Sequence, residues 1–568
     1  MSSPTASTRD PRAAAEDADP RRWVALAVVL IAGFMQLVDI SIVNVAIPSV
    51  QRDLDATYSQ IQWVLAGYQL AFAVTLITGG RLGDIFGRKR LFMLGMAGFT
   101  LASALCGLAQ SPGMLVGSRF LQGVMGAVMF PQILSVIQVT FPPRERGTAF
   151  GIFGATIGLA TITGPLVGGL LIEGDLLGLG WRPIFLVNVP IGIGALAAAA
   201  LYLGESRAPR ALRLDPAGVG LATAGLLLLV YPLVQGRDLG WPAWTFASMA
   251  ASVLVLAAFA AWERRKKAAD GSPLVDLDLF RQRAFVAGLL VSAIFFMGIP
   301  AFFLTFTLWL QIGLGFSALH AGLTGVPFAV ATALASATSV RLAPRLGRRI
   351  LSLGTLLLAA GMGAIIWTVG RYDGGTHSWQ LIPALAVSGL GMGCVVAPLV
   401  TVVLAGIRGQ DAGAASGVLT TAQQVGSAIG VAVIGVIFFG LLSSQAAGVT
   451  ADLAPQLGAS LQSTAGLPAS TSRQVVAGFE ACFQDRASAK DPSAVPPSCQ
   501  RVASQDRVGQ VVAATADVAR RRTFSDAFER TLLFEVGVFL ACLLLTSLLP
   551  DSRRRAPERA PAEAAAGI

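Results

Sequence analysis

Fourteen long apolar stretches constrain this chain more than any other feature of its sequence. Each has about 20 residues or more, enough for an α-helix to cross a hydrocarbon core of about 30 Å. Only helices and closed barrels satisfy all backbone polar groups in lipid, and barrel strands would show short alternating segments. The sequence therefore predicts an all-α polytopic membrane protein with fourteen transmembrane helices. The stretches are 23–48, 59–79, 91–110, 113–139, 147–172, 183–204, 214–235, 243–262, 284–310, 317–340, 350–370, 379–407, 413–441 and 531–549.

The distribution of charge sets the expected orientation. Only 13% of the 568 residues are charged, about half the share of a soluble domain. With the N-terminus in the cytoplasm, 28 of the 42 Lys and Arg residues fall in cytoplasmic segments and four in the six short outer loops. This positive-inside pattern predicts cytoplasmic termini and a multi-pass protein of the cell (inner) membrane. It also accounts for the net charge of +10 without a nucleic-acid partner.

Two short basic loops suggest an internal repeat. Residues 79–90 follow the second stretch and residues 341–349 follow the tenth, and both place a glycine just before a basic pair. Paired six-helix halves describe a large class of transporters that hold substrate near the midplane. We expect disordered cytoplasmic tails and two halves separated by inserted helices and a linker. The predicted units are 1–22 (tail), 23–204 (N-terminal half), 205–262 (two inserted helices), 263–283 (cytoplasmic linker), 284–549 (C-terminal half) and 550–568 (tail).

The outer loop 442–530 is too long to be a simple connection. Apolar residues recur at helical spacing around Phe479 and again around Val512, which predicts a small helical hairpin. Cys482 and Cys499 share this loop on the oxidising side, so we expect a disulfide between them, with two unpaired surface thiols as the alternative. Whether the hairpin gates, binds a partner or covers surface stays open.

One carboxylate and one guanidinium lie deep within the apolar stretches. Asp39 is nine residues from Pro48, hence roughly 13 Å from the outer end of the first stretch, and Arg119 is roughly 9 Å from the outer end of the fourth. Isolated charges are costly at such depths, so both are expected to face the interior or a wet cavity, where they could also face each other. Two interpretations stay open: a fixed ion pair that joins two helices, or a proton-coupling site in which Arg119 tunes Asp39.

The segment GRLGDIFGRKR (80–90) resembles the signature between spans 2 and 3 of the major facilitator superfamily. Other segments are similar to its fourteen-span drug:proton antiporter branch, which includes multidrug and quaternary-ammonium exporters: LVDISIVNVAIP in the first span, RFLQGVMGA (119–127) in the fourth and GATIGLATITGPLVGG (154–169) in the fifth. The resemblance implies the major facilitator fold and two groups of functional residues. They are a gating loop (Gly80, Asp84, Gly87, Arg88, Lys89, Arg90) and an antiporter motif (Gly154, Gly158, Gly164, Pro165, Gly168, Gly169).

Further polar residues are candidates with two interpretations each. Glu535 and Glu173 are either a second proton site or surface carboxylates at the membrane interface. Asn44, Gln122, Gln423 and Gln424 are either substrate contacts or helix-packing hydrogen bonds.

These observations favour a proton-coupled antiporter that exports hydrophobic cationic or neutral drug-like compounds by alternating access. The alternatives are an exporter of lipids or of one lipophilic metabolite, and a membrane sensor that acts through the outer loop. The sequence has no GK[ST] phosphate-binding loop and no CxxC or HExxH spacing, so we expect no enzyme, no cofactor and no metal. The expected partners are small lipophilic substrates, protons and the bilayer, and the expected state is a monomer.

Overall fold

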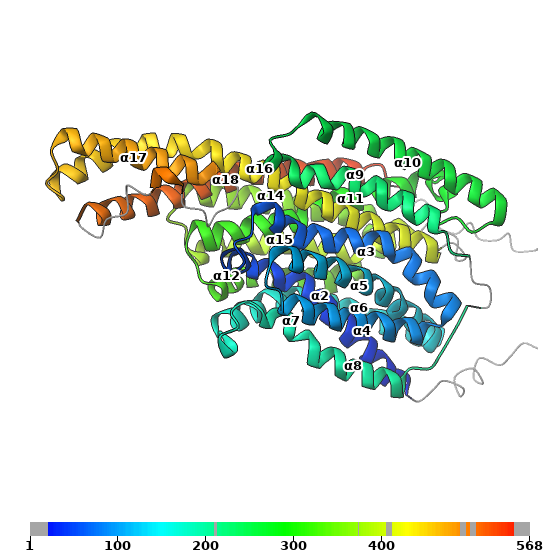
Figure 1. The fold of residues 1–568 in the computed structure, drawn as a ribbon. Coiled ribbons are helices and arrows are strands. Elements are labelled where there is room, and N and C mark those ends of the chain that lie inside the picture. The colour runs from blue at the N-terminus through cyan, green and yellow to red at the C-terminus, as the bar shows by residue number, and fades with distance from the viewer. Residues whose placement is uncertain are drawn as a thin grey trace, which may run out of the picture.

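The computed structural model describes residues 21–208, 213–372, 374–404, 412–488, 496–499 and 507–549, and within them every regular element is helical. The helices run side by side as one elongated bundle, and a thinner arm projects from one end of it (Figure 1). Each of the fourteen predicted stretches coincides with one helix or with two consecutive helices, which confirms the predicted fold class. Twelve of the described spans are long and apolar enough to cross a membrane by length and composition.

The first group of helices extends from the N-terminus to residue 202. Local sequence signals start several of them: Thr57 forms a capping box with Gln60, and Ser111 caps a helix whose first residue is Pro112. Contacts between α3 and α5, α4 and α5, and α2 and α6 hold the group together. Its members are α2 (Arg22–Asp53), α3 (Tyr58–Phe86), α4 (Arg88–Gly107), α5 (Pro112–Thr140), α6 (Pro143–Glu173), α7 (Pro183–Leu186) and α8 (Asn188–Tyr202), with the short η1 (Leu176–Gly178) before α7.

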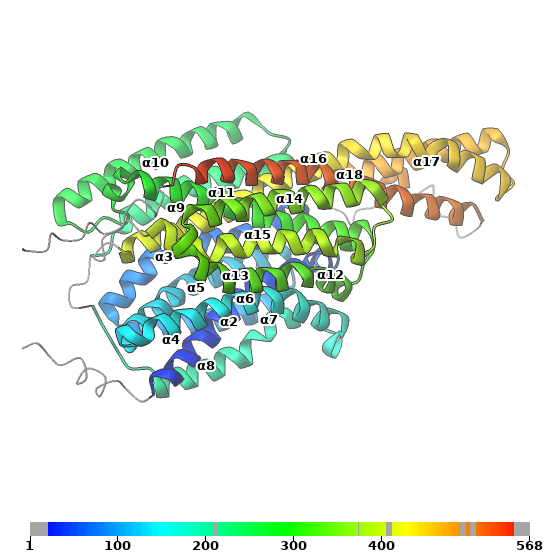
Figure 2. The same cartoon turned by 180° about the vertical axis from the view of Figure 1, so that it is seen from behind.

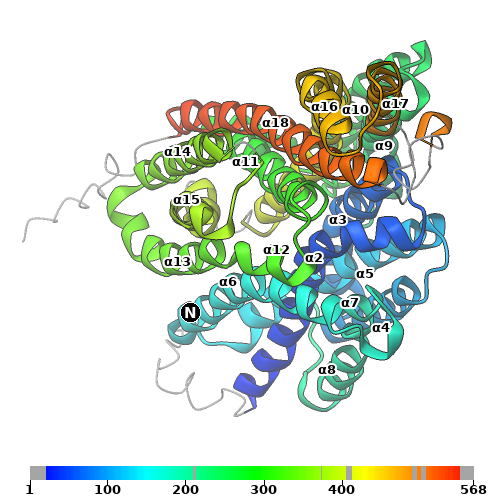
Figure 3. The ribbon, with the colours of Figure 1, turned by 90° about the vertical axis from the view of Figure 1, so that its left-hand side faces the viewer.

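The second group begins after the cytoplasmic linker. Its helices pack through contacts of α13 with α15, α14 with α15, and α11 with α16. Seen end-on, the two groups lie beside each other, with α2, α6 and α12 near the boundary (Figure 3). The members are η2 (Leu277–Arg281), α11 (Arg283–Leu308), η3 (Trp309–Gly313), α12 (Ala318–Thr324), α13 (Val326–Leu346), α14 (Arg348–Tyr372), α15 (Ser378–Leu404), α16 (Ala412–Ser463), α17 (Ala469–Ser488), η4 (Pro497–Cys499) and α18 (Arg507–Thr546).

Two further helices, α9 (Pro216–Leu239) and α10 (Ala243–Asp270), lie between the groups in the sequence. They form an antiparallel pair on the flank of the bundle, where α9 contacts both α3 and α16 (Figure 1). Only about a tenth of the apolar segment of α10 is buried, so most of this helix surface lacks contact with other described parts of the chain. The division into halves and inserted pair at the predicted boundaries stays a prediction.

The arm differs from the predicted hairpin, because two of its three helices are continuations of membrane spans. The 52 residues of α16 and the 40 of α18 correspond to about 78 Å and about 60 Å, far more than a bilayer core. Both run beyond the bundle (Figure 2), where α16 packs against α17 and against α18. The arm has its own apolar core, in which Leu453, Leu457 and Leu461 of α16 meet Phe479 and Val512. The leucine stripe at a spacing of four residues is the signal for this continuation.

A disulfide between Cys482 and Cys499 joins the end of α17 to η4, as expected. The 17-residue separation closes a loop in a region that otherwise depends on one small apolar core. In the chain-entropy model, closing a loop of this size contributes about 3 kcal/mol by restricting the unfolded segment.

Replacing both cysteines by serine (C482S/C499S) should therefore lower the free energy of local unfolding of α17 by about 3 kcal/mol. Hydrogen exchange of α17 amides in the detergent-solubilised protein measures this change. The control is Cys394→Ser, which alters a free thiol elsewhere. Equal protection of α17 in both variants would contradict the prediction.

Candidate functional site

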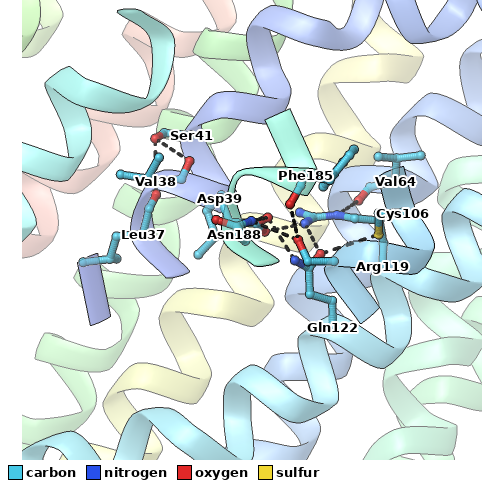
Figure 4. Close-up of polar contacts among 12 residues, drawn as sticks. Leu37, Val38, Asp39, Ser41, Val64, Cys106, Arg119, Gln122, Phe185 and Asn188 are labelled. Atoms are coloured by element: carbon cyan, nitrogen blue, oxygen red, sulfur yellow. Dashed lines mark hydrogen bonds and ion pairs between the residues drawn. The ribbon is translucent and has the colours of Figure 1, made fainter. Parts of the chain in front are cut away.

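The Asp39 carboxylate lies inside the first helix group and accepts three side-chain hydrogen bonds. Arg119 Nη1 is 2.6 Å from Asp39 Oδ2. Gln122 Nε2 and Asn188 Nδ2 each donate to Oδ1 over 2.9 Å. Asp39 has 0% and Arg119 1% of its side chain exposed, so the pair is fully enclosed in this conformation. The two charges face each other, which the sequence had left as one option (Figure 4).

The guanidinium of Arg119 is held from several sides. Its Nε donates to the Val64 carbonyl on α3 over 3.2 Å, and Nη1 also donates to Gln122 Oε1 over 2.6 Å. The ring of Tyr68 lies under the guanidinium, 4.3 Å from Cζ to the ring centroid. A buried ion pair is favourable only when further hydrogen bonds satisfy its remaining polar atoms. The neighbours of Arg119 provide this compensation.

Four helices bring these residues together, and one partner was not predicted. Asp39 belongs to α2, Arg119 and Gln122 to α5, and Val64 to α3. Asn188, the first residue of α8, also donates to Ser103 Oγ over 3.0 Å, which ties α8 to α4 as well as to α2. An asparagine within an apolar stretch was the available sequence signal for this residue.

Gln122 uses its amide within this cluster and is 0% exposed. The geometry therefore shows a helix-packing role for it in this conformation. Asn44 has a different position: it lines a small cavity of about 60 Å³ together with Pro165 and Phe306. Gln423 and Gln424 are partly buried on α16.

The predicted antiporter motif lies at the boundary between the two groups. Within the first group, a Cβ on Gly164 would collide with Ser41 Oγ of α2; across the boundary, one on Gly169 would lie 2.7 Å from the Leu319 Cα of α12. From the other side, a Cβ on Gly322 would lie 2.6 Å from the Pro165 carbonyl oxygen. Small residues at such contacts allow close backbone approach. Gly168 likewise approaches Ile42, and Gly154 and Gly158 belong to the same helix, α6.

Two hydrogen bonds cross this boundary near the end of α6. Gln311 Nε2 donates to the Val45 carbonyl over 2.8 Å, and Ser317 Oγ donates to Glu173 Oε2 over 2.8 Å. Deeper in the bundle, α16 packs against α3, and Thr421 Oγ1 donates to the Ala73 carbonyl over 3.4 Å. Glu173 is exposed at this position, as its surface interpretation predicts.

The gating loop between α3 and α4 is fastened to the segment that follows α8. Asp84 accepts a hydrogen bond from Arg88 of its own loop over 2.9 Å, and Arg88 N–H donates to the Ser206 carbonyl over 2.9 Å. Glu205 accepts from Lys89 N–H over 3.1 Å. Gly87 has a φ of +116°, and a Cβ there would lie 2.5 Å from Glu205 Oε1, so the position requires glycine. Of the remaining members, Gly80 faces Pro131 and Arg90 lies 3.6 Å from Glu205 Oε2.

Glu535 does not lie at the surface, so the surface interpretation is wrong for this residue. Its side chain on α18 is 0% exposed and faces α11, where a Cβ on Gly298 would lie 2.8 Å from Oε2. Among the described residues, neither carboxyl oxygen has a hydrogen-bond partner. Burying an unpaired carboxylate is far more costly than burying the neutral acid, so we expect Glu535 to carry its proton in this conformation.

A large cavity of about 1200 Å³ lies between the arm and the outer ends of the membrane helices. Aromatic residues line it from both sides, including Phe316, Phe479 and Phe524, together with Glu173 and Arg520. No group of three or more His, Cys, Asp or Glu side chains that could hold a metal ion occurs in the described part of the chain.

Comparisons with known proteins agree on one family. A family model described as Major Facilitator Superfamily matches residues 29–234 and 214–431. The "Probable actinorhodin transporter" of Streptomyces coelicolor is 44% identical over 536 residues, which are 94% of this chain and 93% of that protein. The "Puromycin resistance protein pur8" of Streptomyces alboniger is 38% identical over 75% of this chain and 84% of its own length. A bacterial homologue of the human lysosomal transporter Spinster, solved inward-facing and occupied, covers 94% of this chain and 98% of its own, with a TM-score of 0.58 at 16% identity.

Removing one charge of the Asp39–Arg119 pair should destabilise the protein far more than removing both. Asp39→Leu leaves Arg119 as an unpaired buried charge, which should cost about 3–5 kcal/mol. The double variant Asp39→Leu/Arg119→Met replaces both charges by apolar groups and should recover a large part of that loss. Thermal unfolding in detergent measures both effects. The control is Asp55→Asn, an exposed residue with a φ of 49°, a value that asparagine tolerates.

A double variant that is less stable than the single variant would contradict this account of the pair.

Proposed function

The chain belongs to the major facilitator superfamily and is a multi-pass membrane transporter, not an enzyme; on that premise we propose that it exports hydrophobic cationic or neutral drug-like compounds in exchange for protons. The observation that carries the proposal is the 44% identity, over 94% of the chain, to a protein named "Probable actinorhodin transporter". A second relative is named for resistance to puromycin. We place the protein in the cell membrane with both termini in the cytoplasm.

Transport would proceed by alternating access between the two helix groups. The contact of α6 with α12 rests on Gly169 and Gly322, and two hydrogen bonds between the groups lie near it, from Gln311 to Val45 and from Ser317 to Glu173. Such contacts lose little when they separate, because small residues bury little area and their polar partners can be rehydrated. We propose that these contacts open when substrate is released outside the cell. They close again when the transporter returns to the conformation that is open to the cytoplasm.

Asp39 is the proposed proton-coupling residue. In the described conformation its carboxylate is enclosed and accepts three side-chain hydrogen bonds. Coupling needs a second conformation in which water reaches Asp39 and its proton affinity differs. Movement of α8 would provide one route, because Asn188 is the partner that comes from outside α2 and α5. Arg119 would tune the carboxylate through its charge and its hydrogen bond to Asp39.

The number of protons decides whether membrane potential contributes. Exchange of one proton for one monovalent cation moves no net charge, whereas each additional proton would add about 2.3 kcal/mol per 100 mV. Glu535 and Glu173 are the candidates for a second proton. We favour Glu535, because it is buried and lacks a partner in the described part of the chain, whereas Glu173 is exposed and bonded to Ser317.

Asp39→Asn should reduce uphill efflux at least tenfold, because asparagine retains the size of the side chain but cannot bind and release a proton. Dye efflux in inverted vesicles under an imposed pH gradient measures it, with Asp55→Asn as the matched acid-to-amide control. Uphill pumping by Asp39→Asn at the rate of the unmodified protein would rule out Asp39 as the coupling residue.

Glu535→Gln should remove the response of efflux to membrane potential and leave the response to the pH gradient in place. The same vesicles, with voltage set by a potassium diffusion potential, measure the two responses separately. Glu529→Gln, a partly buried residue nearer the outer end of α18, is the control. If Glu173→Gln and not Glu535→Gln removes the voltage response, the second proton belongs to Glu173.

A further inference from the structure

Two buried carboxyl groups meet at the cytoplasmic base of the inserted helix pair, outside the site described above. Asp215 precedes α9 and is 3% exposed, and Glu263, the first charged residue after the apolar stretch of α10, is 1% exposed. Asp215 Oδ1 accepts from Gly218 N–H over 3.0 Å and from Trp262 Nε1 over 3.0 Å. Asp215 therefore caps α9 and attaches the end of α10 to it.

The two carboxyl groups point into the same small space. A Cβ built on Gly218 would lie 2.5 Å from Asp215 Oδ2 and also 2.5 Å from Glu263 Oε1. Within the described residues, Glu263 Oε1 has no hydrogen-bond partner, although the side chain is buried. Two ionised carboxylates cannot share such a space without strong repulsion, whereas a single proton between them forms a hydrogen bond.

The other oxygen of Glu263 holds the start of the linker that leads to the second helix group. Glu263 Oε2 accepts from Val275 N–H over 2.8 Å. Arg81, from the gating loop at the end of α3, holds the same segment: it donates to the carbonyls of Ser272 over 3.2 Å and Leu274 over 3.4 Å, and also to that of Pro273. The linker 272–275 is thus fixed from two sides, by α3 and by the carboxyl pair.

The charged groups around the pair are few. Arg81 faces it from α3 and also donates to the carbonyl of Arg213 in the segment before α9. Asp270 of α10 is the other nearby acid, and Lys266 pairs with it over 2.7 Å. Arg81 has its own hydrogen bonds to the linker carbonyls, and no ion pair between it and either carboxyl group occurs among the described residues.

We propose that Asp215 and Glu263 bind one shared proton, and that this proton holds the linker 272–275 against the base of α9 and α10. We name this arrangement the linker latch. It is closed when the pair is protonated and weakens when the proton leaves, because the two carboxylates then repel each other beside the bond to Val275.

The cytoplasmic pH range in which the latch responds follows from the environment of Glu263. Burial raises the pKa of Glu263 from 4.5 to about 7; it outweighs the hydrogen bond from Val275 and the charge of Arg81, which lower this pKa, and the neighbouring Asp215 raises it further. In a released linker the carboxyl group would return to its ordinary pKa, so between these two values the closed latch holds one proton more than the open one. The latch is therefore strongest at low pH, weakens about tenfold per pH unit as the pH rises to about 7, and stays at its weakest above that.

The consequence for transport rests on the proposed function. Proton-coupled export brings protons into the cytoplasm, and a latch that closes on acidification would fasten the connection between the helix groups and slow further exchange. The latch would then limit proton entry when the cytoplasm is already acidic.

Hydrogen exchange of the Val275 amide in the full-length protein in nanodiscs tests the latch without any transport assay. After correction for intrinsic exchange, we expect the protection of the 271–282 peptide to be about tenfold higher at about pH 6 than at about pH 7.5. Glu263→Gln should remove this difference and keep the protection high, because the amide donates to Asp215 and still accepts from Val275. The control Glu480→Gln, on α17, should behave like the unmodified protein.

Equal protection of the unmodified protein at the two pH values would overturn the proposal, and so would an unchanged pH dependence in Glu263→Gln. Efflux in vesicles with the cytoplasmic face set to the same two pH values tests the consequence for transport. If efflux is absent at both pH values while the exchange result holds, the proposed function fails and the latch stands. If efflux is present and the exchange result is flat, the latch fails alone.

Discussion

The cost of placing charge in an apolar solvent governs the structure of this protein. Asp39 can exist as a carboxylate inside the bundle only because Arg119, Gln122 and Asn188 all donate to it. Those donors come from α5 and α8, while Arg119 is in turn held by α3 and the ring of Tyr68. One charged group thereby fixes the mutual positions of four helices. The same cost makes the site a candidate for coupling, since any change in its hydration changes the relative free energies of its protonated and ionised forms.

The boundary between the helix groups has the opposite character. There, Gly169 of α6 and Gly322 of α12 allow the two groups to approach closely, and only a few hydrogen bonds among the described residues join the groups. A transporter that rocks needs rigid groups and a weak, well-fitting contact between them. The polar cluster within the first group and the glycine contacts between the groups provide these two properties in different places.

Much of this arrangement could be predicted from sequence, and the failures have physical reasons. Apolar length predicts the spans, and the cost of buried charge places Asp39 and Arg119 in the interior. The glycine motif of α6 was implied by the resemblance to the antiporter branch. The arm could not be delimited in the same way, because Leu453, Leu457 and Leu461 extend a helix after its membrane stretch has ended. The roles of Asn188 and of the pair Asp215–Glu263 could not be predicted, because they depend on neighbours distant in sequence. The surface position expected for Glu535 was wrong, because its distance from the end of the span gives its depth in the membrane but not the direction of its side chain.

One continuous helix, α16, links the membrane region to the arm. It starts at the end of the bundle opposite the arm, packs along α3 and α11, and ends in the core of the arm without a break in its helix. About 33 Å of it extends past residue 441. It is therefore built as a lever: a tilt of roughly 10° about its membrane segment would sweep the tip through several ångströms. The position of the arm outside the cell would then differ between the states of the transport cycle. A ligand that binds the arm in only one of its positions would distinguish these states.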